Sequence, residues 1–507
     1  VGLFYYLWLG QHGTQGPYDI SKIEAADPQA LAKPDSPLWP DPTHSPMLHW
    51  GEPLFGYYLS TDEWVLRRHV QMFIDAGIDV LYFDTTNGYH YREVTDRLFA
   101  LLQEYHDKGF KVPRFCYYMA PVRRGSGTSN VLDVWDNYYR DRRFSDLYFL
   151  WEGKPLIITH ADRPYRQEIL DFFTFRTPAW VGQDQAGDNT WPWIDWCYPP
   201  ERHGNVMCVS VSSHHWTKNS WMGNEKNGEM RPTAAWNFGC FAWGRGYDVK
   251  TNRNIAEDVV KGTYYQSVWD AVKVMDPEIA FVSGWNEWCC GVEYNAEYKT
   301  YELYDSFDME FSRDIEMMKG GYGDNFLVET VVNTRAFGYA PVTGEPAAEK
   351  SIDLTGPVSQ WDDVPARYVC TGSLNYGRDS KGANASLHYE TPAAENSIQE
   401  VRVASDAAYV YFLVRCDGDI RVGGNRMNLF IGTGTPSLKG WNGYEYLIGR
   451  TVADGHASVE SLGADFVTGT VGQADVTVDG AYMQVRLARS FVGLAEDSTL
   501  YFKLADS

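Results

Sequence analysis

A glutamate flanked by two tryptophans follows the apolar run EIAFVS in the stretch GWNEWCCG, residues 284–291. If that run is a strand, side-chain alternation places Trp285 and Glu287 on one face and Asn286 on the other. An apolar neighbour favours the neutral form of a carboxyl group, which suits Glu287 to general acid chemistry near neutral pH. The structural alternative is a Glu287 that is paired with an arginine at the mouth of a barrel.

Acid and base chemistry usually needs a second carboxylate, and several positions can supply one. Asp84 ends the apolar run IDVLYF, whereas Asp184 and Asp195 lie in the polar and aromatic stretch 182–196. Asp84 is the first choice because it ends a rigid strand; the two loop aspartates follow, and then Glu293. Each also has a structural interpretation, since Asp84 can cap its own turn and loop carboxylates are commonly only solvated.

Aromatic and amide side chains gather at the same strand ends. This composition suits a polyhydroxylated ligand, because sugar rings stack their C–H faces on aromatic planes. Seventeen of the 19 tryptophans lie before residue 345, so this chemistry belongs to the first two thirds of the chain. The residues that we expect to bind such a ligand are Tyr6, Trp8, Trp50, Trp191, Trp193, Asp195, His214, Arg245, Trp285 and Asn286.

A metal site is not expected from the sequence. His214 and His215 are adjacent, and adjacent side chains on an extended segment point to opposite faces, so at most one of them can be a ligand. No HxH, HxxxH or CxxC motif occurs, and the eight cysteines have no framework spacing. Cys289 and Cys290 are expected to be reduced packing residues.

The elements that position these residues alternate between strand and helix. Helices are predicted at 60–77, where Ser60 and Glu63 form a capping box and Gly77 ends the helix, and at 92–108 and 255–275. Strands are predicted at 2–9, 78–88, 112–120, 149–160, 172–182, 206–215 and 279–285, with an uncertain eighth around 237–244.

Continuously apolar strands that alternate with helices predict a (β/α)8 barrel over residues 1–340, with its functional face at the C-terminal strand ends. A doubly wound sheet is the alternative, although no GxGxxG follows the first strand. A Pro/Gly/Ala-rich linker is expected at 341–357. Short β runs between turn signals then predict an antiparallel β-sandwich over 358–507.

Charge and hydropathy limit the partners. The 507 residues carry a formal net charge of −23, which argues against nucleic acid or an anionic membrane surface. No apolar run reaches the length of a membrane span. The expected partner is neutral or small.

Several motifs resemble those of bacterial glycoside hydrolase family 71/99-like (WbsX-like) proteins over residues 1–340. They are GWNEW after a strand, YYLWLG near the start, WEGKP before the fourth strand, and FSRDIEMMKGGYGDNFLVETVVNTRAFG. The stretches SIDLTGPVSQWDDV and VRVASDAAYVYFLVRC resemble family 9-like carbohydrate-binding or DOMON-like sandwiches. In family 99 proper two glutamates stand three residues apart; here the first falls on Glu287 and the second on Cys290, which cannot serve as acid and base toward a glycosidic oxygen.

The resemblance implies a glycoside hydrolase that cleaves a glycosidic bond in a polysaccharide or glycoconjugate with Glu287 and a second carboxylate at the barrel rim. It implies an oligo- or polysaccharide partner, no cofactor, and a secreted or periplasmic location; the chain as given begins at Val1 without a basic leader. The sandwich can either bind glycan or pack structurally. The alternative functions are a non-catalytic glycan-binding barrel and, third, a metal-dependent hydrolase.

Overall fold

The computed structural model describes the chain except for residues 11–16, 29, 31–35, 40–46, 120–126, 180–185, 194–197, 213–224, 227–228, 231–242, 296–299, 304–307, 339–347, 373–374, 385, 425, 434–440, 442–443, 464, 496–497 and 507. The backbone alone is described for residues 47, 127–129, 225–226, 229–230, 290–295 and 300–303. Two compact units are present. The first comprises Val1–Pro341 with Ser380–Tyr389, and the second comprises Val342–Asp379 with Glu390–Ser507.

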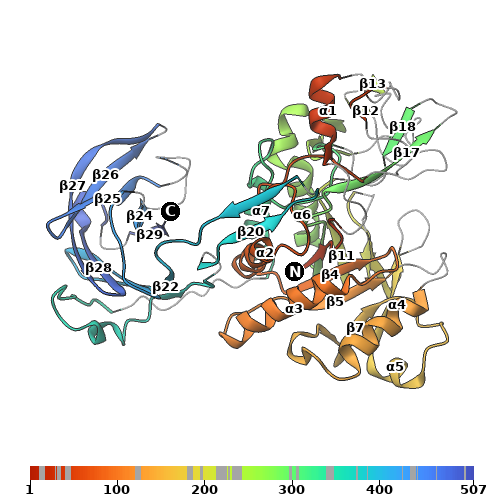
Figure 1. Cartoon of the computed structure of the whole chain (residues 1–507), viewed down its shortest axis with the longest axis horizontal. Coiled ribbons are helices and arrows are strands. Elements are labelled where there is room, and N and C mark those ends of the chain that lie inside the picture. Colours follow the sequence, from red (N-terminus) through yellow and green to blue (C-terminus); the bar gives the residue numbers. More distant parts are fainter. Residues whose placement is uncertain are drawn as a thin grey trace. The chain divides into compact units, whose positions relative to one another are not determined.

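The first unit is built on a sheet of mostly parallel strands that curls into a nearly closed barrel (Figure 1). Its parallel strands within the described residues are β1 (Gly2–Tyr5), β4 (Val80–Thr85), β5 (Arg114–Met119), β7 (Lys154–Ile158), β8 (Thr174–Ala179), β9 (Thr190–Pro192), β11 (Val206–Ser210) and β16 (Ile279–Ser283). They neighbour one another in chain order, and β16 pairs back onto β1. Antiparallel β6 (Leu150–Trp151) and β10 (Arg202–His203) pair with β7 and β11, and β9 contacts both β10 and β11.

All seven strands predicted from apolar runs are present. The eighth differs from the prediction: β9 is short and carries Trp191, whereas the expected strand at 237–244 falls mostly outside the described residues. Continuously buried patterns in β1, β4, β11 and β16 explain why these segments form central strands, since both faces of a parallel barrel strand are covered.

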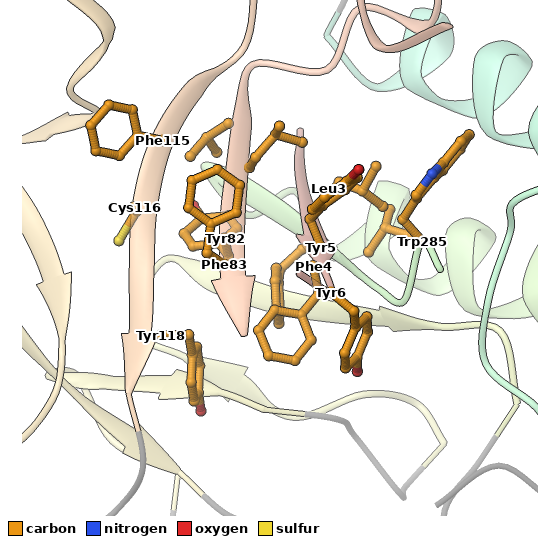
Figure 2. Packing of buried hydrophobic residues seen from close by; sticks show 14 of the residues in the cluster. Leu3, Phe4, Tyr5, Tyr6, Tyr82, Phe83, Phe115, Cys116, Tyr118 and Trp285 are labelled. Atoms are coloured by element: carbon orange, nitrogen blue, oxygen red, sulfur yellow. The ribbon is translucent and has the colours of Figure 1, made fainter. Parts of the chain in front are cut away.

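Aromatic rings fill the interior of the barrel. Phe4 meets Tyr118 and Phe281 edge-on at centroid distances of 5.4 and 5.6 Å, and Tyr82 meets Phe281 at 5.0 Å. Figure 2 shows Phe4 and Tyr6 close together, with Trp285 pointing elsewhere beside Tyr5. The interior is therefore a packed core rather than a pore.

Helices α2 (Glu63–Ala76) and α3 (Arg92–Asp107) lie where they were predicted. The capping box expected for α2 is wrong, because its N-cap is Asp62, whose carboxylate accepts from the Val65 N–H at 3.4 Å. Ser60 instead accepts the N–H of Leu9 at 3.0 Å. Gly77 ends α2 with a φ of 71°, as predicted.

The helix predicted at 255–275 is two elements. A 3₁₀ segment, η5 (Ala256–Lys261), stops at Gly262, and α6 (Thr263–Met275) begins there. Gly262 has a φ of 68°, and a Cβ at that position would lie 2.2 Å from a carboxylate oxygen of Glu329. Backbone geometry that only glycine adopts easily therefore breaks the helical periodicity.

The other helical elements are α1 (Ile20–Ala26), α4 (Gly127–Val134), α5 (Gln167–Phe172), α7 (Asn325–Phe337), the π-helical turn η3 (Trp135–Tyr139) and the 3₁₀ turns η4 (Ser145–Leu147), η6 (Val358–Trp361) and η8 (Arg489–Phe491). A smaller sheet has the strand order β18 (Thr300–Leu303), β17 (Cys289–Asn295), β3 (Met47–His49) and β2 (Tyr18–Asp19). Two short hairpins pair β12 (Glu225–Lys226) with β13 (Glu229–Met230) and β14 (Tyr247–Asp248) with β15 (Arg253–Asn254). No helix in the described part of the chain has the length and apolar composition of a membrane crossing.

The second unit is one antiparallel sheet that curls into a half-barrel, which is consistent with a sandwich-like domain. Tyr368 and Phe502, on its two edge strands, meet at 5.0 Å. Ile352, inside the predicted linker, packs with Trp361 in a small buried cluster of this unit. Its strands, in sheet order, are β19 (Arg367–Val369), β22 (Ile398–Ser405), β23 (Tyr409–Cys416), β28 (Tyr482–Ala488), β27 (Phe466–Asp479), β26 (His456–Gly463), β25 (Tyr446–Ala453), β24 (Asn428–Thr433) and β29 (Leu500–Ala505).

A hairpin from the C-terminal part of the sequence contributes residues 380–389 to the barrel unit. It is formed by β20 (Arg378–Lys381) and β21 (His388–Thr391). The N–H of Ala383 donates to the carbonyl of Tyr57 at 2.7 Å, and the hydroxyl of Tyr389 accepts the N–H of Tyr57 at 2.8 Å. The barrel unit is therefore discontinuous in sequence.

Candidate active site

The Glu287 segment leaves the barrel strand before it reaches the glutamate. Strand β16 ends at Ser283, and Gly284 follows with a φ of 105°. A Cβ on Gly284 would lie 2.6 Å from the carbonyl oxygen of Arg313, so only glycine fits this crossing. The alternation expected for Trp285 and Glu287 therefore does not apply, because residues 284–288 are no longer a strand.

Three buried polar groups hold Glu287. Its carboxylate accepts from Nη2 of Arg313 at 2.8 Å, and these two side chains are 7 % and 1 % exposed. Its N–H donates to Oδ1 of Asp314 at 2.6 Å, and its carbonyl accepts from Nε1 of Trp50 at 2.8 Å. The structural alternative, a carboxylate paired with an arginine at the barrel mouth, is thus what the structure contains.

The arginine changes the chemistry expected of Glu287. A guanidinium at 2.8 Å favours the ionised form of a carboxyl group, which is opposite to the effect expected from an indole. The prediction of a neutral Glu287 tuned as a general acid by Trp285 therefore loses its physical basis. An ionised Glu287 is suited to act as a base, as a nucleophile or as an electrostatic stabiliser.

Trp285 and Asn286 support the barrel and do not face the site. The Trp285 ring packs edge-on against Phe73 of α2 at 4.7 Å and is 1 % exposed. The Asn286 amide is bonded to the backbone of Tyr6: its oxygen accepts the Tyr6 N–H at 2.9 Å, and its nitrogen donates to the Tyr6 carbonyl at 3.1 Å. Both were expected to bind ligand; in the structure Trp285 packs against α2 and Asn286 fixes the backbone of Tyr6.

Tyr6 is within electrostatic reach of the two carboxylates that the sequence singled out. It follows β1 directly, and β1 is flanked by β16 on one side and by β4, the strand of Asp84, on the other. Burial raises the pKa of Tyr6 well above its usual value, and the negative charges of Glu287 and Asp84 raise it further against the opposing charge of Arg313. Asp84 ends one strand beside β1, Glu287 lies just beyond the other, and the charges of both act on the Tyr6 phenol.

Asp84 both caps a turn and acts electrostatically on the Tyr6 phenol. Its Oδ1 accepts the N–H of Thr86 at 2.9 Å, so it does cap the turn that follows β4. It also raises the pKa of Tyr91, for which burial is the larger cause. Asp84 is only 6 % exposed. Its turn contact fixes the carboxylate without removing it from the neighbourhood of Tyr6.

The aromatic residues expected to bind sugar divide into two groups. Trp8 and Trp193 are 8 % and 7 % exposed, and Trp8 meets the Tyr6 ring edge-on at 6.4 Å. Trp191 and Trp50 are fully buried: Trp191 packs on Tyr82 in the barrel interior, and Trp50 stacks on another indole, Trp288, at 4.3 Å. Only the first group retains any accessible surface for a ligand.

Arg245 is likewise fully buried and supports the chain behind Glu287. Its Nη2 donates to Oγ of Ser312 at 2.9 Å and to the carbonyl of Asp314 at 2.7 Å. Its guanidinium lies over the ring of Phe326 at 4.3 Å. We expected Arg245 to bind sugar, and in the structure it is committed to the segment that carries Arg313 and Asp314.

Three of the expected site residues, Asp184, Asp195 and His214, lie outside the described residues. The side chains of Cys290 and Glu293 also lie outside them, although both residues are part of β17. Cys289 is buried and free, with its sulfur 3.4 Å from Nε2 of His49. Burial raises the pKa of the Cys289 thiol and lowers the pKa of His49 to about 4, so both groups are neutral and suited to packing.

The segment Phe311–Glu316 contributes the functional side chains that the sequence analysis missed. Arg313 and Asp314 hold Glu287, and Glu316 accepts from Tyr58 at 2.7 Å and binds Nε2 of His69 at 2.7 Å. The available signal was SRDIE, a charged run between buried apolar residues and inside the motif FSRDIEMMKGG. All these carboxylates and cations are nearly fully buried, and buried charges must be paired.

In the described part of the chain no group of three or more His, Cys, Asp or Glu side chains is arranged to hold a metal ion.

Comparisons with known proteins give distant structural likeness only. No protein-family model matches the chain, and no curated protein matches it in sequence. Among solved structures, a family 99 endo-alpha-mannosidase from Bacteroides thetaiotaomicron is 14 % identical with a TM-score of 0.37, covering 66 % of this chain and 97 % of that one. An alpha-fucosidase from Thermotoga maritima in complex with fucose is 9 % identical with a TM-score of 0.24, covering 99 % and 95 %. Likeness at this level leaves substrate and activity to be inferred from the residues themselves.

Proposed function

We propose that this chain is a glycoside hydrolase that cleaves a glycosidic bond in a polysaccharide or glycoconjugate with Glu287 and Asp84. The observation that carries the proposal is the placement of Asp84 at the end of β4 and of Glu287 just beyond β16, on the two strands that flank β1, with the charges of both acting on the Tyr6 phenol. Glycosidic bond cleavage commonly uses a pair of carboxyl groups, one ionised and one able to donate a proton.

The two carboxylates differ in environment, which favours different roles. Glu287 is paired with Arg313 and is therefore the ionised member, acting as base or nucleophile. Asp84 is 6 % exposed, and burial favours the neutral form that a proton donor to the leaving oxygen needs; the N–H of Thr86 on one oxygen holds the carboxyl group in place. Tyr6 is proposed to orient the sugar between them, with Trp8 and Trp193 at the margin.

We also propose that the first unit is a (β/α)8 barrel. The proposal is supported by strands that neighbour one another in chain order and by helices such as α2, α3 and α6 between some of them; the strands are β1, β4, β5, β7, β8, β9, β11 and β16. We propose the second unit as an accessory sandwich that assists glycan binding. Export to the periplasm or beyond would bring such an enzyme to polymeric substrate.

The test is release of reducing ends from a panel of polysaccharides and of nitrophenol from aryl glycosides. Glu287→Gln and Asp84→Asn should each lower the rate by about 10²–10⁴-fold, because each removes a group that acts in proton transfer or attack. Asp79→Asn is the matched control: Asp79 lies at the opposite end of β4 and pairs with Lys111, so the rate should stay within about twofold.

Three outcomes separate the candidate functions. Full turnover by Glu287→Gln removes this residue from the mechanism. Tight glycan binding without hydrolysis by the unaltered chain would favour the alternative, a non-catalytic glycan-binding barrel. Loss of hydrolysis in a chelator would show a metal-dependent hydrolase instead.

A further inference from the structure

The segment Phe311–Glu316 is joined to the Glu287 loop along its backbone. The N–H of Ile315 donates to the carbonyl of Gly284 at 3.2 Å, and the N–H of Glu316 donates to the carbonyl of Trp285 at 3.0 Å. Next to these two bonds, Oδ1 of Asp314 accepts the N–H of Glu287 at 2.6 Å. The Asp314 side chain therefore bonds the backbone of the residue that carries the proposed catalytic carboxylate.

The backbone that carries Asp314 is fixed by two buried side chains, Arg245 and Ser212. Arg245 donates to the Asp314 carbonyl at 2.7 Å and to Oγ of Ser312 at 2.9 Å. The Ser212 hydroxyl donates to the carbonyl of Ser312 at 2.9 Å. The carboxyl group itself is 0 % exposed, and its Oδ2 has no hydrogen-bond partner among the described residues.

We propose that Asp314 is a positioning residue for Glu287 and that it gains and loses a proton within the working pH range of the site. The inference rests on the proposed function, since it assigns to Asp314 control of the Glu287 carboxylate. The geometry that carries it is a fully buried carboxyl group with one oxygen on the Glu287 N–H and the other without a partner. An unpartnered buried oxygen is where a proton is most easily accommodated.

The charges around Asp314 oppose one another. Burial raises its pKa to about 6, while the N–H of Glu287 and the cations Arg313 and Arg245 lower it and Glu316 raises it. Tyr322 and Tyr6 also lie within electrostatic reach, and the charge of Asp314 raises the pKa of each phenol. Asp314 is thus the buried group next to Glu287 whose charge changes near neutrality.

The protonation state of Asp314 changes how the charge of Arg313 is shared between neighbouring carboxylates. When Asp314 is neutral, the charge of Arg313 is paired with that of Glu287 and is not shared with Asp314. When Asp314 ionises, a second negative charge shares the guanidinium and disfavours the Glu287 anion. The Oδ1 acceptor remains in both states, so the position of Glu287 persists while its electrostatic surroundings change.

The experiment compares Asp314→Asn and Asp314→Ala with the unaltered full chain, using the glycoside hydrolysed best in the panel. Asparagine keeps the acceptor for the Glu287 N–H and removes the titration; alanine removes both. Asp314→Asn should keep kcat within about threefold at pH 5 and lose the titration near pH 6 from its rate profile. Asp314→Ala should lose about 10- to 100-fold in kcat with KM within twofold, because Glu287 is misplaced.

Thermal unfolding provides a second readout that needs no substrate. The buried Asp314 keeps a proton that the unfolded chain releases above about pH 4, so the unaltered chain should lose stability as the pH rises from about 4 to 6. The gain in unfolding temperature of Asp314→Asn over the unaltered chain should therefore be larger at pH 8 than at pH 5. Glu329→Gln is the matched control, since burial raises the pKa of that carboxyl to about 8 outside the site. It should change the unfolding profile and leave the rate profile intact.

Two results would overturn the inference. One is an Asp314→Asn chain whose unfolding temperature differs from the unaltered chain by the same amount at pH 5 and pH 8. The other is an Asp314→Ala chain with unaltered kcat. If no glycan in the panel is hydrolysed, the proposed function fails, and the unfolding comparison still decides whether Asp314 exchanges a proton.

Discussion

The ion pair between Arg313 and Glu287 should be strongly coupled in stability, because both side chains are almost fully buried. The two groups are 1 % and 7 % exposed, and their N–O distance is 2.8 Å. Arg313→Met keeps an aliphatic side chain of similar length and removes the guanidinium. The carboxylate then remains buried without its cation, which costs about 3–5 kcal/mol in comparable buried pairs.

A double-mutant cycle separates this loss from lost packing. Urea unfolding at pH 7 is measured for the unaltered chain, Arg313→Met, Glu287→Gln and the double variant. Glu287→Gln removes the buried carboxylate that has lost its cation, so the double variant should be more stable than Arg313→Met alone. The control cycle uses Arg97 and Glu93, a pair that is 44 % and 67 % exposed at 3.2 Å and should couple by about 0.5 kcal/mol or less.

A small coupling would refute the reasoning. If Arg313→Met costs under about 1 kcal/mol, or if the coupling energy equals that of the exposed control pair, then Arg313 does not neutralise a buried Glu287 carboxylate. The assignment of Glu287 as the ionised member of the catalytic pair would lose its support.

Three further predictions concern the frame around the site. Gly262→Ala should lower the free energy of unfolding by about 1–2 kcal/mol in urea, because its φ is 68° and the new methyl group would displace the Glu329 carboxylate. Burial raises the pKa of Glu329 to about 8, so the folded state retains a proton that the unfolded state loses; stability should fall as pH rises from about 5 to 8, and Glu329→Gln should flatten that part of the profile. Tyr389→Phe should cost about 1 kcal/mol, measured as a lower unfolding temperature, because the N–H of Tyr57 loses its 2.8 Å acceptor.

The barrel strands were predictable because their signal is local. Runs such as IDVLYF and EIAFVS are apolar on both faces, and only a covered parallel strand accommodates that pattern. The same runs placed Asp84 at the end of a strand, as the structure has it, and Glu287 just beyond one; their joint role in a site stays a prediction. The position of a residue on a barrel strand can therefore be predicted from the sequence when it depends only on the apolar pattern of that strand.

The partners of Glu287 were not predictable from its neighbours in sequence. Arg313 and Asp314 lie 26 and 27 residues further along the chain, and no local pattern specifies which buried cation meets which carboxylate. The orientation predicted for Trp285 is wrong for a related reason, because the chain leaves the strand at Gly284, one residue before Trp285. Charged residues inside an apolar motif, as in SRDIE, indicate buried charges that must be paired with other side chains.

The way in which Glu287 is held argues for a catalytic rather than a stabilising role. Its carboxylate, N–H and carbonyl each have a separate buried polar partner, namely Arg313, Asp314 and Trp50. Burying such charged groups gains little stability compared with apolar packing of the same volume. It does fix one carboxylate in position and charge before a ligand arrives, which is what electrostatic catalysis requires. The catalytic role proposed for Glu287 needs a proton donor from another residue, and we propose Asp84 at the end of β4, whose charge also acts on the Tyr6 phenol.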